Sequence, residues 1–293
     1  MTNTQNALLG PVQIRELAER FGVNPTKSKG QNFLHDAGTV RKIVRESGVV
    51  AGQRVVEVGP GLGSLTLGLL EIGADVVAIE LDVLLANELA NTVWERMPQA
   101  ADRIEVVRGD ALAITELPGV QPTAFVANLP YNVSVPILLT FLERFPTLET
   151  IMVMVQLEVA DRIVAKPGSK VYGIPSVKTA WYGTGTRAMR VGRNVFWPAP
   201  NVDSALVFID RTAPPETEAT REEVFAVVDA AFAHRRKTLR QNLAGLAGSA
   251  ANAQVVLEAA GIDPSARGEQ LTVTQFATIA EQLAKHPRLD PQA

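Results

Sequence analysis

The stretch "RVVEVGPGLG", residues 54–63, joins a run rich in valine to a turn rich in glycine. Valine favours a pleated strand, and glycine permits the left-handed backbone that a tight turn requires. Downstream, strand-like runs at 75–82, 103–112, 123–130 and 150–158 alternate with helix-like runs at 64–73, 83–97 and 135–145. Such alternation is typical of a doubly wound, mostly parallel sheet. The sequence therefore predicts an α/β fold whose ligands bind at the carboxyl ends of the strands.

The later part of the chain loses this alternation. Glycine-punctuated β segments at 179–192 and 203–210 indicate antiparallel strands that close the edge of the sheet. Residues 211–223, "RTAPPETEATREE", are rich in Pro and Glu and indicate a linker that leads into a helix. The remaining runs, at 224–246, 252–261 and 272–285, have helical periodicity and predict helices. We therefore predict an α/β domain over 1–213 and a small all-helical domain over 214–293.

The composition of the 293 residues excludes several classes of protein. Hydrophobic residues make up 46% and charged residues 20%, as in ordinary globular proteins. Cysteine is absent, which excludes disulfides, thiolate catalysis and Cys-ligated zinc, and the three histidines lie far apart, so we expect no metal site. The N-terminal "MTNTQNALLGPVQIRELAER" lacks the pattern of a signal peptide, and no apolar run is long enough for a membrane helix. The sequence therefore predicts a cytoplasmic protein.

Two stretches carry positive charge without any acid, although the net charge is −3 and the pI about 5.8. "AFAHRRKTLRQNL" contains Arg235, Arg236, Lys237 and Arg240, and "GTGTRAMRVGR" contains three further arginines. A ligand responds to charges within about 8 Å at physiological salt, so local patches matter more than the total. A solvated helix face is the simpler interpretation of either run alone. The pair nevertheless favours a polyanionic partner.

The turn "EVGPGLG" places Gly59, Gly61 and Gly63 directly after the first strand. The spacing is GxGxG, whereas the dinucleotide fingerprint requires GxGxxG, and Ser64 occupies the position of its third glycine. NAD is therefore a less favoured ligand. The glycines would still let the backbone approach a ligand closely, because no side chain stands in the way.

Carboxylates follow the next two strands. Glu80 ends the second strand, where it could accept hydrogen bonds from ribose hydroxyls, and Asp110 ends the third, where it could accept one from an adenine amine. Either acid alone is better explained as a turn or cap residue. Beside the glycine turn, the two acids predict a nucleoside site without a phosphate-binding lysine. Such a site suits S-adenosylmethionine, whose sulfonium is a cation, better than a polyphosphate.

The strand at 124–127 ends in Asn128, Leu129, Pro130 and Tyr131. The exocyclic amine of a purine is a poor nucleophile because its lone pair is delocalised into the ring. The Asn128 side-chain oxygen and the Leu129 carbonyl could accept hydrogen bonds from this amine and localise the lone pair towards an incoming methyl group. Pro130 would stiffen the turn, and Tyr131 could stack on the base, which contributes about 1–3 kcal/mol. An Asx turn with Tyr131 in the core is the structural alternative.

Together these blocks resemble a known family, the KsgA-type rRNA adenine N6,N6-dimethyltransferases. The resemblance covers most of the chain and rests on "GQNFL", "EVGPGLGSLT", "AIELD", "GDAL", "NLPYNVS", "KPGSKVYG" and "FWPAPNVDSALV", in the order of the family. It implies a Rossmann-like, S-adenosylmethionine-dependent methyltransferase. The family converts two adjacent adenosines near the 3′ end of 16S rRNA, within the immature 30S subunit, into dimethyladenosines. We expect a monomer that contacts no membrane.

The resemblance also assigns residues to the cofactor and to the target base. The cofactor contacts would come from Asn32, Leu34, Gly59, Glu80, Asp110 and Asn128. Among these, Glu80 would hold the ribose, Asp110 the adenine, and Asn128 would bridge the cofactor and the target. Phe196 would stack on the base opposite Tyr131, although the residues alone indicate only a core aromatic beside a Pro-rich turn.

Three alternatives share parts of this pattern. Erm-type 23S rRNA methyltransferases have similar glycine and NLPY-like blocks but modify a single adenine, and the "FxPxPxVDSA" block with the helical tail favours the small-subunit enzyme. DNA adenine and protein glutamine methyltransferases more usually carry Pro-Pro-Tyr. From a different class, the chain could be a ribosome-assembly factor whose methylation is secondary.

Overall fold

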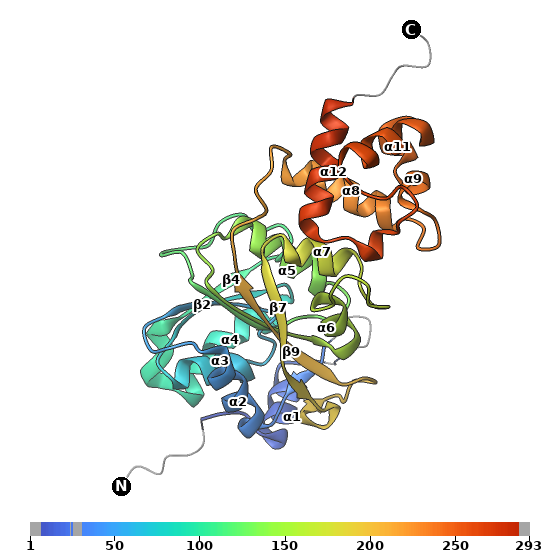
Figure 1. The fold of residues 1–293 in the computed structure, drawn as a ribbon. Helices are drawn as coiled ribbons and strands as arrows, with labels where there is room; N and C mark the ends of the chain where they lie inside the picture. The colour runs from blue at the N-terminus through green and yellow to red at the C-terminus, as the bar shows by residue number, and fades with distance from the viewer. Residues whose placement is uncertain (1–6, 24, 26–30, 287–293) are drawn as a thin grey trace. The chain divides into compact units, whose positions relative to one another are not determined.

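A seven-stranded sheet is the central element of the computed structural model, which describes residues 7–23, 25 and 31–286 (Figure 1). The strands are ordered β4-β3-β2-β5-β6-β9-β7. Their bounds are β2 Arg54–Val58, β3 Asp75–Glu80, β4 Ile104–Arg108, β5 Ala124–Asn128, β6 Thr150–Gln156, β7 Gly183–Val191 and β9 Ser204–Arg211. A separate two-stranded sheet pairs β1 (Phe33–Leu34) with β8 (Phe196–Trp197).

The direction of the strands confirms the predicted doubly wound sheet. From β4 to β6 in the sheet order, all neighbouring strands are parallel. The chain adds β3 and β4 on one side of β2 and then returns to add β5 and β6 on the other side. The position between the neighbouring strands β2 and β5 is therefore the topological switch point, where ligands bind in folds of this kind. β9 is antiparallel to β6, as predicted, and β7 forms the edge beyond it.

Helices cover both faces of the sheet (Figure 1). On one face Ala124 and Val126 of β5 join the same buried cluster as the apolar residues of α2, α3 and α4. On the other face Phe125 stacks on Phe141 of α5, with ring centroids 4.8 Å apart, because successive strand side chains alternate in direction. The bounds are α1 Pro11–Arg20, α2 Ala37–Ser47, α3 Ser64–Glu71, α4 Val83–Arg96 and α5 Ser134–Arg144, with 3₁₀ helices at Pro98–Arg103 and Arg193–Val195.

The chain divides into two compact units. Unit 1 comprises Met1–Ala160 and Thr186–Arg211, and unit 2 comprises Asp161–Gly185 and Thr212–Ala293. The second segment of unit 2 begins two residues before the predicted start of the helical domain at 214. Residues 161–185 also group with it, which the sequence pattern does not indicate. The helices here are α6 Leu157–Ile163, which spans the division, α7 Ile174–Ala180, α8 Arg221–Phe232, α9 Leu239–Asn242, α10 Ala244–Ala247, α11 Ala250–Ala259, α12 Val273–Lys285 and a 3₁₀ helix at Gly268–Gln270.

Unit 2 has a core of its own, which explains why residues 161–185 belong to it. Phe232 of α8 packs against Tyr172 and against Phe276 of α12, with ring centroids 6.2 and 6.1 Å apart. The buried Tyr172 hydroxyl donates to the Leu271 carbonyl oxygen at 2.7 Å, so its polar atom is satisfied. In the part of the chain that the structure describes, no helix combines the length and apolarity needed to cross a membrane.

Two local predictions are partly wrong, one at the start of a strand and one within a helix. The sequence predicts a strand over 179–192, but its first residues finish α7 and the strand begins at Gly183. Helix α7 is stabilised at its N-terminus by a capping hydrogen bond, in which Ser176 Oγ accepts from the Gly173 N–H at 3.0 Å. The β-like composition of the segment does not indicate this cap. The predicted helix over 224–246 is interrupted after Phe232, and α9 restarts behind its own N-cap, Thr238.

Candidate active site

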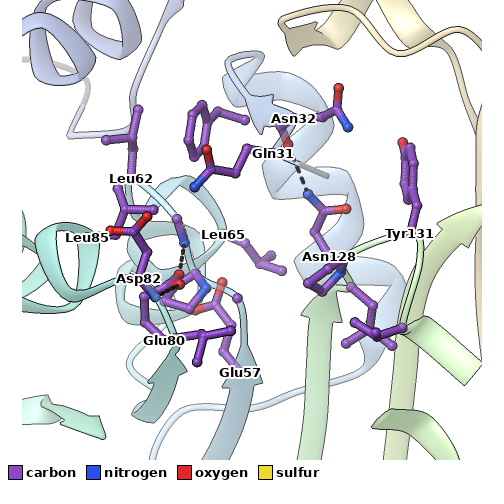
Figure 2. Close-up of a pocket in the computed structure, with 18 of the residues that line it drawn as sticks. Gln31, Asn32, Glu57, Leu62, Leu65, Glu80, Asp82, Leu85, Asn128 and Tyr131 are labelled. Carbon is purple, nitrogen blue, oxygen red and sulfur yellow. Dashed lines mark hydrogen bonds between the residues drawn. The ribbon is translucent and has the colours of Figure 1, made fainter. Parts of the chain in front are cut away.

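A cavity of about 720 Å³ opens at the carboxyl ends of β2, β3, β4 and β5 (Figure 2). The cavity lies at the switch point of the sheet, where parallel strands direct their carboxyl ends to one edge. The segment that contains β1 forms the opposite wall. The predicted site residues that line the cavity are Asn32, Leu34, Gly59, Gly61, Glu80, Asp110, Asn128, Leu129, Pro130 and Tyr131. Residues 26–30, the last of which is the first residue of the "GQNFL" block, lie outside the described residues.

The glycine turn is shaped by close approaches on both sides. A Cβ at Gly61 would lie 2.9 Å from the Phe33 ring, and one at Gly59 would lie 3.5 Å from the Pro130 side chain. Both glycines have positive φ, +69° at Gly59 and +58° at Gly61. An L side chain at either position would therefore strain the backbone, and at Gly61 it would also displace the wall of the cavity.

Glu80 is held at the end of β3 by backbone donors (Figure 2). Its carboxylate accepts from the Gly61 N–H at 3.2 Å and from the Asp82 N–H at 2.9 Å. Burial raises the pKa of Glu80, and these two N–H groups act against that rise. Each carboxylate oxygen has two lone pairs, so both can still accept from a ligand hydroxyl. The arrangement suits the predicted role at a ribose.

Glu57 is a second acid in the cavity, which the sequence analysis does not assign. It is 1% exposed, lines the cavity and accepts from Thr66 Oγ1 at 2.6 Å. Burial raises the pKa of Glu57 to about 8, with a smaller contribution from the nearby Glu80 carboxylate. The signal was present in the sequence, because a lone acid stands among the valines of "RVVEV".

Gln31 and Asp110 complete the polar lining. The Gln31 Oε1 atom is buried and has no hydrogen-bond partner among the described residues, and Figure 2 shows this side chain above the cavity. An unsatisfied buried acceptor is costly unless a ligand or water supplies a donor. Asp110 accepts from the Leu112 N–H at 2.9 Å, so it both caps its turn and faces the cavity.

The turn after β5 presents Asn128 in one orientation. The Asn128 Nδ2 atom donates to the Asn32 carbonyl oxygen at 3.3 Å (Figure 2). This bond uses the amide nitrogen, so the side-chain oxygen remains the acceptor available to a substrate. The Leu129 N–H donates to the Met154 carbonyl oxygen of the neighbouring strand at 3.1 Å. The segment at Asn32 thus orients the Asn128 side-chain oxygen, the acceptor that the sequence predicts, from almost a hundred residues away.

Tyr131 is fixed by a residue that the sequence analysis does not identify. Its hydroxyl forms a 2.7 Å hydrogen bond with the hydroxyl of Ser204, which is fully buried at the start of β9. Burial raises the pKa of Tyr131, so the phenol stays protonated at neutral pH. Figure 2 shows Asn128 and Tyr131 on one side of the cavity and Glu80 and Asp82 on the other. A base beside the tyrosine ring and a nucleoside beside Glu80 would thus face one another.

Two predicted residues do not line the cavity. Gly63 is the N-cap of α3 with φ +94°, and a Cβ there would lie 2.9 Å from Leu89 Cδ1 of α4, so this glycine serves helix packing. Phe196 is 2% exposed and belongs to the hydrophobic cluster, where it pairs with Leu34 across β1 and β8. In this conformation Phe196 has the core position that its local sequence indicates, and its stacking role stays a prediction.

The two basic runs have different surroundings. Arg235, Arg236, Lys237 and Arg240 are exposed in unit 2, on the loop after α8 and on α9. Arg190 of the other run lies in unit 1 and pairs with Asp203, with Nε 3.0 Å from Oδ2. Although this run contains no acid in the sequence, the fold pairs one of its arginines with an acid from another segment. This pairing makes the run a weaker candidate for anion binding.

Residues 23–285 match the family described as Ribosomal RNA adenine dimethylase. The chain belongs to this family. The ribosomal RNA small subunit methyltransferase A of Streptomyces griseus is 63% identical over 283 residues, which are 96% of this chain and 97% of the relative. A dimethyladenosine transferase from Plasmodium falciparum has the same fold, with a TM-score of 0.72, 23% identity and coverage of 87% of this chain and 98% of that one. The 23S rRNA methyltransferase ErmE gives a TM-score of 0.63 and 28% identity, over 86% of this chain and 100% of its own.

As a member of the family, the chain is an rRNA adenine methyltransferase that uses S-adenosylmethionine. The cavity fits this cofactor. Among the described residues that line it, Glu57, Glu80, Asp82 and Asp110 are acidic and none is basic. An acidic cavity favours a cationic sulfonium and disfavours a polyphosphate. Within the described residues no group of three or more potential metal ligands occurs.

Proposed function

We propose that this protein dimethylates the N6 atoms of two adjacent adenosines near the 3′ end of 16S rRNA, in the immature small ribosomal subunit. The observation that carries the proposal is the Asn128–Tyr131 turn, with its acceptor and its aromatic ring facing the acidic cavity. The relative from Streptomyces griseus is named for the small subunit, which supports this choice of substrate. A ribosomal substrate would be met in the cytoplasm, by an enzyme that acts as a monomer.

The turn residues would activate the target amine. The Asn128 Oδ1 atom and the Leu129 carbonyl oxygen accept from the exocyclic N–H groups and direct the nitrogen lone pair into the cavity. Tyr131 stacks on the adenine ring, so the base is held in one plane. S-adenosylmethionine supplies the methyl group on a positively charged sulfur. A strong general base is unnecessary because the methylated amine readily loses its proton to solvent.

The remaining cavity residues would hold the cofactor. Glu80 accepts from the ribose hydroxyls, and Asp110 accepts from the adenine amine. Asn32 and Leu34 close the wall above it, and the backbone at Gly59 approaches its methionine part. Glu80 and Asp110 act as acceptors and as negative charges. No proton transfer by them is required for this chemistry.

In unit 2, the exposed cationic run that contains Arg235, Arg236, Lys237 and Arg240 would bind phosphates of the RNA. Their support is local charge, because each phosphate contact releases condensed counterions and strengthens binding at low salt. Charge reversal across these positions should weaken RNA binding and flatten its dependence on salt.

The test uses purified protein, labelled S-adenosylmethionine and two substrates, immature 30S subunits and protein-free 23S rRNA, followed by nucleoside analysis. Dimethyladenosine in the 16S rRNA of the 30S substrate is the expected result. Its absence there would contradict the proposal.

A second candidate is methylation of 23S rRNA, favoured by the likeness to ErmE. Dimethyladenosine on the naked 23S rRNA alone would support this candidate. The chemistry at the Asn128 turn would then stand, and the proposed RNA partner would be replaced. Asn128→Ala also tests the assembly-factor alternative, when maturation of the small subunit is scored separately from methylation. A variant that no longer methylates but still binds subunits and supports their maturation would favour that alternative.

A further inference from the structure

Three loops of unit 2 meet around Arg235. The first comprises residues 166–172, the second residues 233–240, and the third residues 263–270. They are far apart in the sequence. The sequence pattern identifies only the second as a cationic run, whereas the first appears there as the block "KPGSKVYG". We call them together the three-loop surface.

Arg235 connects the first and third of these loops. Its Nη2 atom donates to the Lys170 carbonyl oxygen at 2.7 Å and lies 3.4 Å from the Glu269 carboxylate. The Gly168 N–H donates to the Glu269 carbonyl oxygen at 2.7 Å, which binds the same two loops directly. The Arg235 guanidinium thus binds groups of the protein itself. It is nevertheless one of the four cations that the sequence indicates as contacts of a polyanionic partner.

Backbone hydrogen bonds connect the second loop to the third. The Leu239 N–H donates to the Ala266 carbonyl oxygen at 2.8 Å, and the Arg240 N–H donates to the Pro264 carbonyl oxygen at 3.2 Å. Main-chain bonds of this kind fix the loops relative to each other without using side-chain charge. The long cationic side chains are left to reach outward.

The side chains of the surface are predominantly cationic. Its exposed cations are Lys166, Lys170, Arg235, Arg236, Lys237, Arg240 and Arg267. Its acids are Asp263, which accepts from Ser265 Oγ at 2.7 Å, and Glu269, which Arg235 faces. Among the described residues, none forms a side-chain hydrogen bond or ion pair with the ammonium group of Lys166 or Lys170. Charges held apart from acids attract a polyanion at long range.

We propose that the three-loop surface as a whole binds the sugar–phosphate backbone of the substrate RNA. Lys166 and Lys170 contact phosphates together with Arg236, Lys237 and Arg240, while Arg235 positions the loops. This inference rests on the proposed function for the identity of the RNA. A membrane is a poorer partner, because Val171 is the only large apolar side chain exposed on these described loops and interfacial binding requires an apolar face.

The test measures equilibrium binding of full-length protein to a labelled 3′-terminal fragment of 16S rRNA between about 50 and 200 mM KCl. The variant Lys166→Gln/Lys170→Gln is compared with Arg236→Gln/Lys237→Gln. Lys42→Gln/Arg45→Gln, on the exposed side of α2 in unit 1, is the control with the same change of charge. The thermal midpoint of each variant shows whether it is folded.

A plot of log K against log salt has a negative slope. Both loop variants should reduce the magnitude of this slope by about 1–2, because two phosphate contacts are lost in each. The control should keep the slope of the parent protein. The inference would be overturned if Lys166→Gln/Lys170→Gln kept the salt dependence of the parent protein while Arg236→Gln/Lys237→Gln had a shallower one. RNA binding would then be limited to the second loop. The methylation assay on 30S subunits tests the proposed function separately, so either can fail alone.

The role of Arg235 is tested by Arg235→Lys, which keeps the charge but loses the forked geometry of the guanidinium. If Arg235 positions the loops, RNA affinity falls several-fold and hydrogen exchange at the amides of Gly168 and Lys170 becomes faster. Parental affinity and exchange would make Arg235 another phosphate contact and overturn this part of the inference.

Discussion

The active-site cavity of unit 1 and the three-loop surface of unit 2 use charge in opposite ways. Glu80 is 8% exposed, and its carboxylate is held by hydrogen bonds from two backbone N–H groups. Arg236 and Lys237 are exposed to solvent. A buried charge is costly unless it is paired, so each cavity residue has one geometry, whereas exposed cations act through a screened and additive field. Single substitutions should therefore have large effects in the cavity and small, graded effects on the surface.

Asn128→Ala should give the largest effect. It removes the acceptor that activates the target amine, so single-turnover methyl transfer to rRNA should slow by about 10²–10³-fold. Calorimetric binding of S-adenosylhomocysteine should change much less. The control is Asn132→Ala, because Asn132 is exposed on the same rim of the cavity. A rate within a few-fold of the parent protein would remove Asn128 from the mechanism.

Glu80→Gln sharpens the comparison at the cofactor. The substitution keeps the shape of the side chain but replaces charge-assisted hydrogen bonds by neutral ones. The affinity for S-adenosylmethionine should fall roughly 10–100-fold, since each charged bond is worth about 1 kcal/mol more than a neutral one. The control is Glu88→Gln on α4, whose carboxylate bonds to Asn91. Equal loss of affinity in both variants would contradict a specific role for Glu80.

Glu57 connects the cavity to the pH dependence of stability. Burial raises the pKa of Glu57 from 4.5 to about 8, so between these values the folded protein keeps a proton that the unfolded chain loses. The free energy of unfolding should therefore decrease as pH rises from about 4.5 to about 8, by a few kcal/mol. Urea unfolding at several pH values should show a shallower decrease for Glu57→Gln, with a remainder due to Glu80. Parallel curves for the two proteins would contradict this.

Ser204→Ala should give the smallest effect of the four. It removes one hydrogen bond to Tyr131, worth about 1 kcal/mol, and should lower kcat about fivefold without weakening cofactor binding. Tyr131→Phe should have a similar effect, and the double variant should be no worse than either single one, because both remove the same contact. Additive losses would show that the two hydroxyls act independently.

Much of the fold and part of the site follow from local sequence patterns. The alternation of strand-like and helix-like runs predicts the parallel sheet, and the carboxyl ends of its strands bring Glu80, Asp110 and Asn128 to one edge. The prediction holds because it needs only the period of the pattern and the direction of the strands. It is less accurate at 179–192 and at 233–238, where caps and turns outweigh composition.

By itself, the sequence determined the sheet, the glycine turn and the chemical types of residue at its edge. Only the tertiary structure decided that Ser204 orients Tyr131, that Phe196 is buried and that Arg190 meets Asp203. It also decided that residues 161–185 join unit 2 and bring Lys170 against Arg235. The reason is physical, because periodicity acts between neighbours in the chain. Contacts across many residues depend on strand register and on the packing of cores, which no local pattern contains.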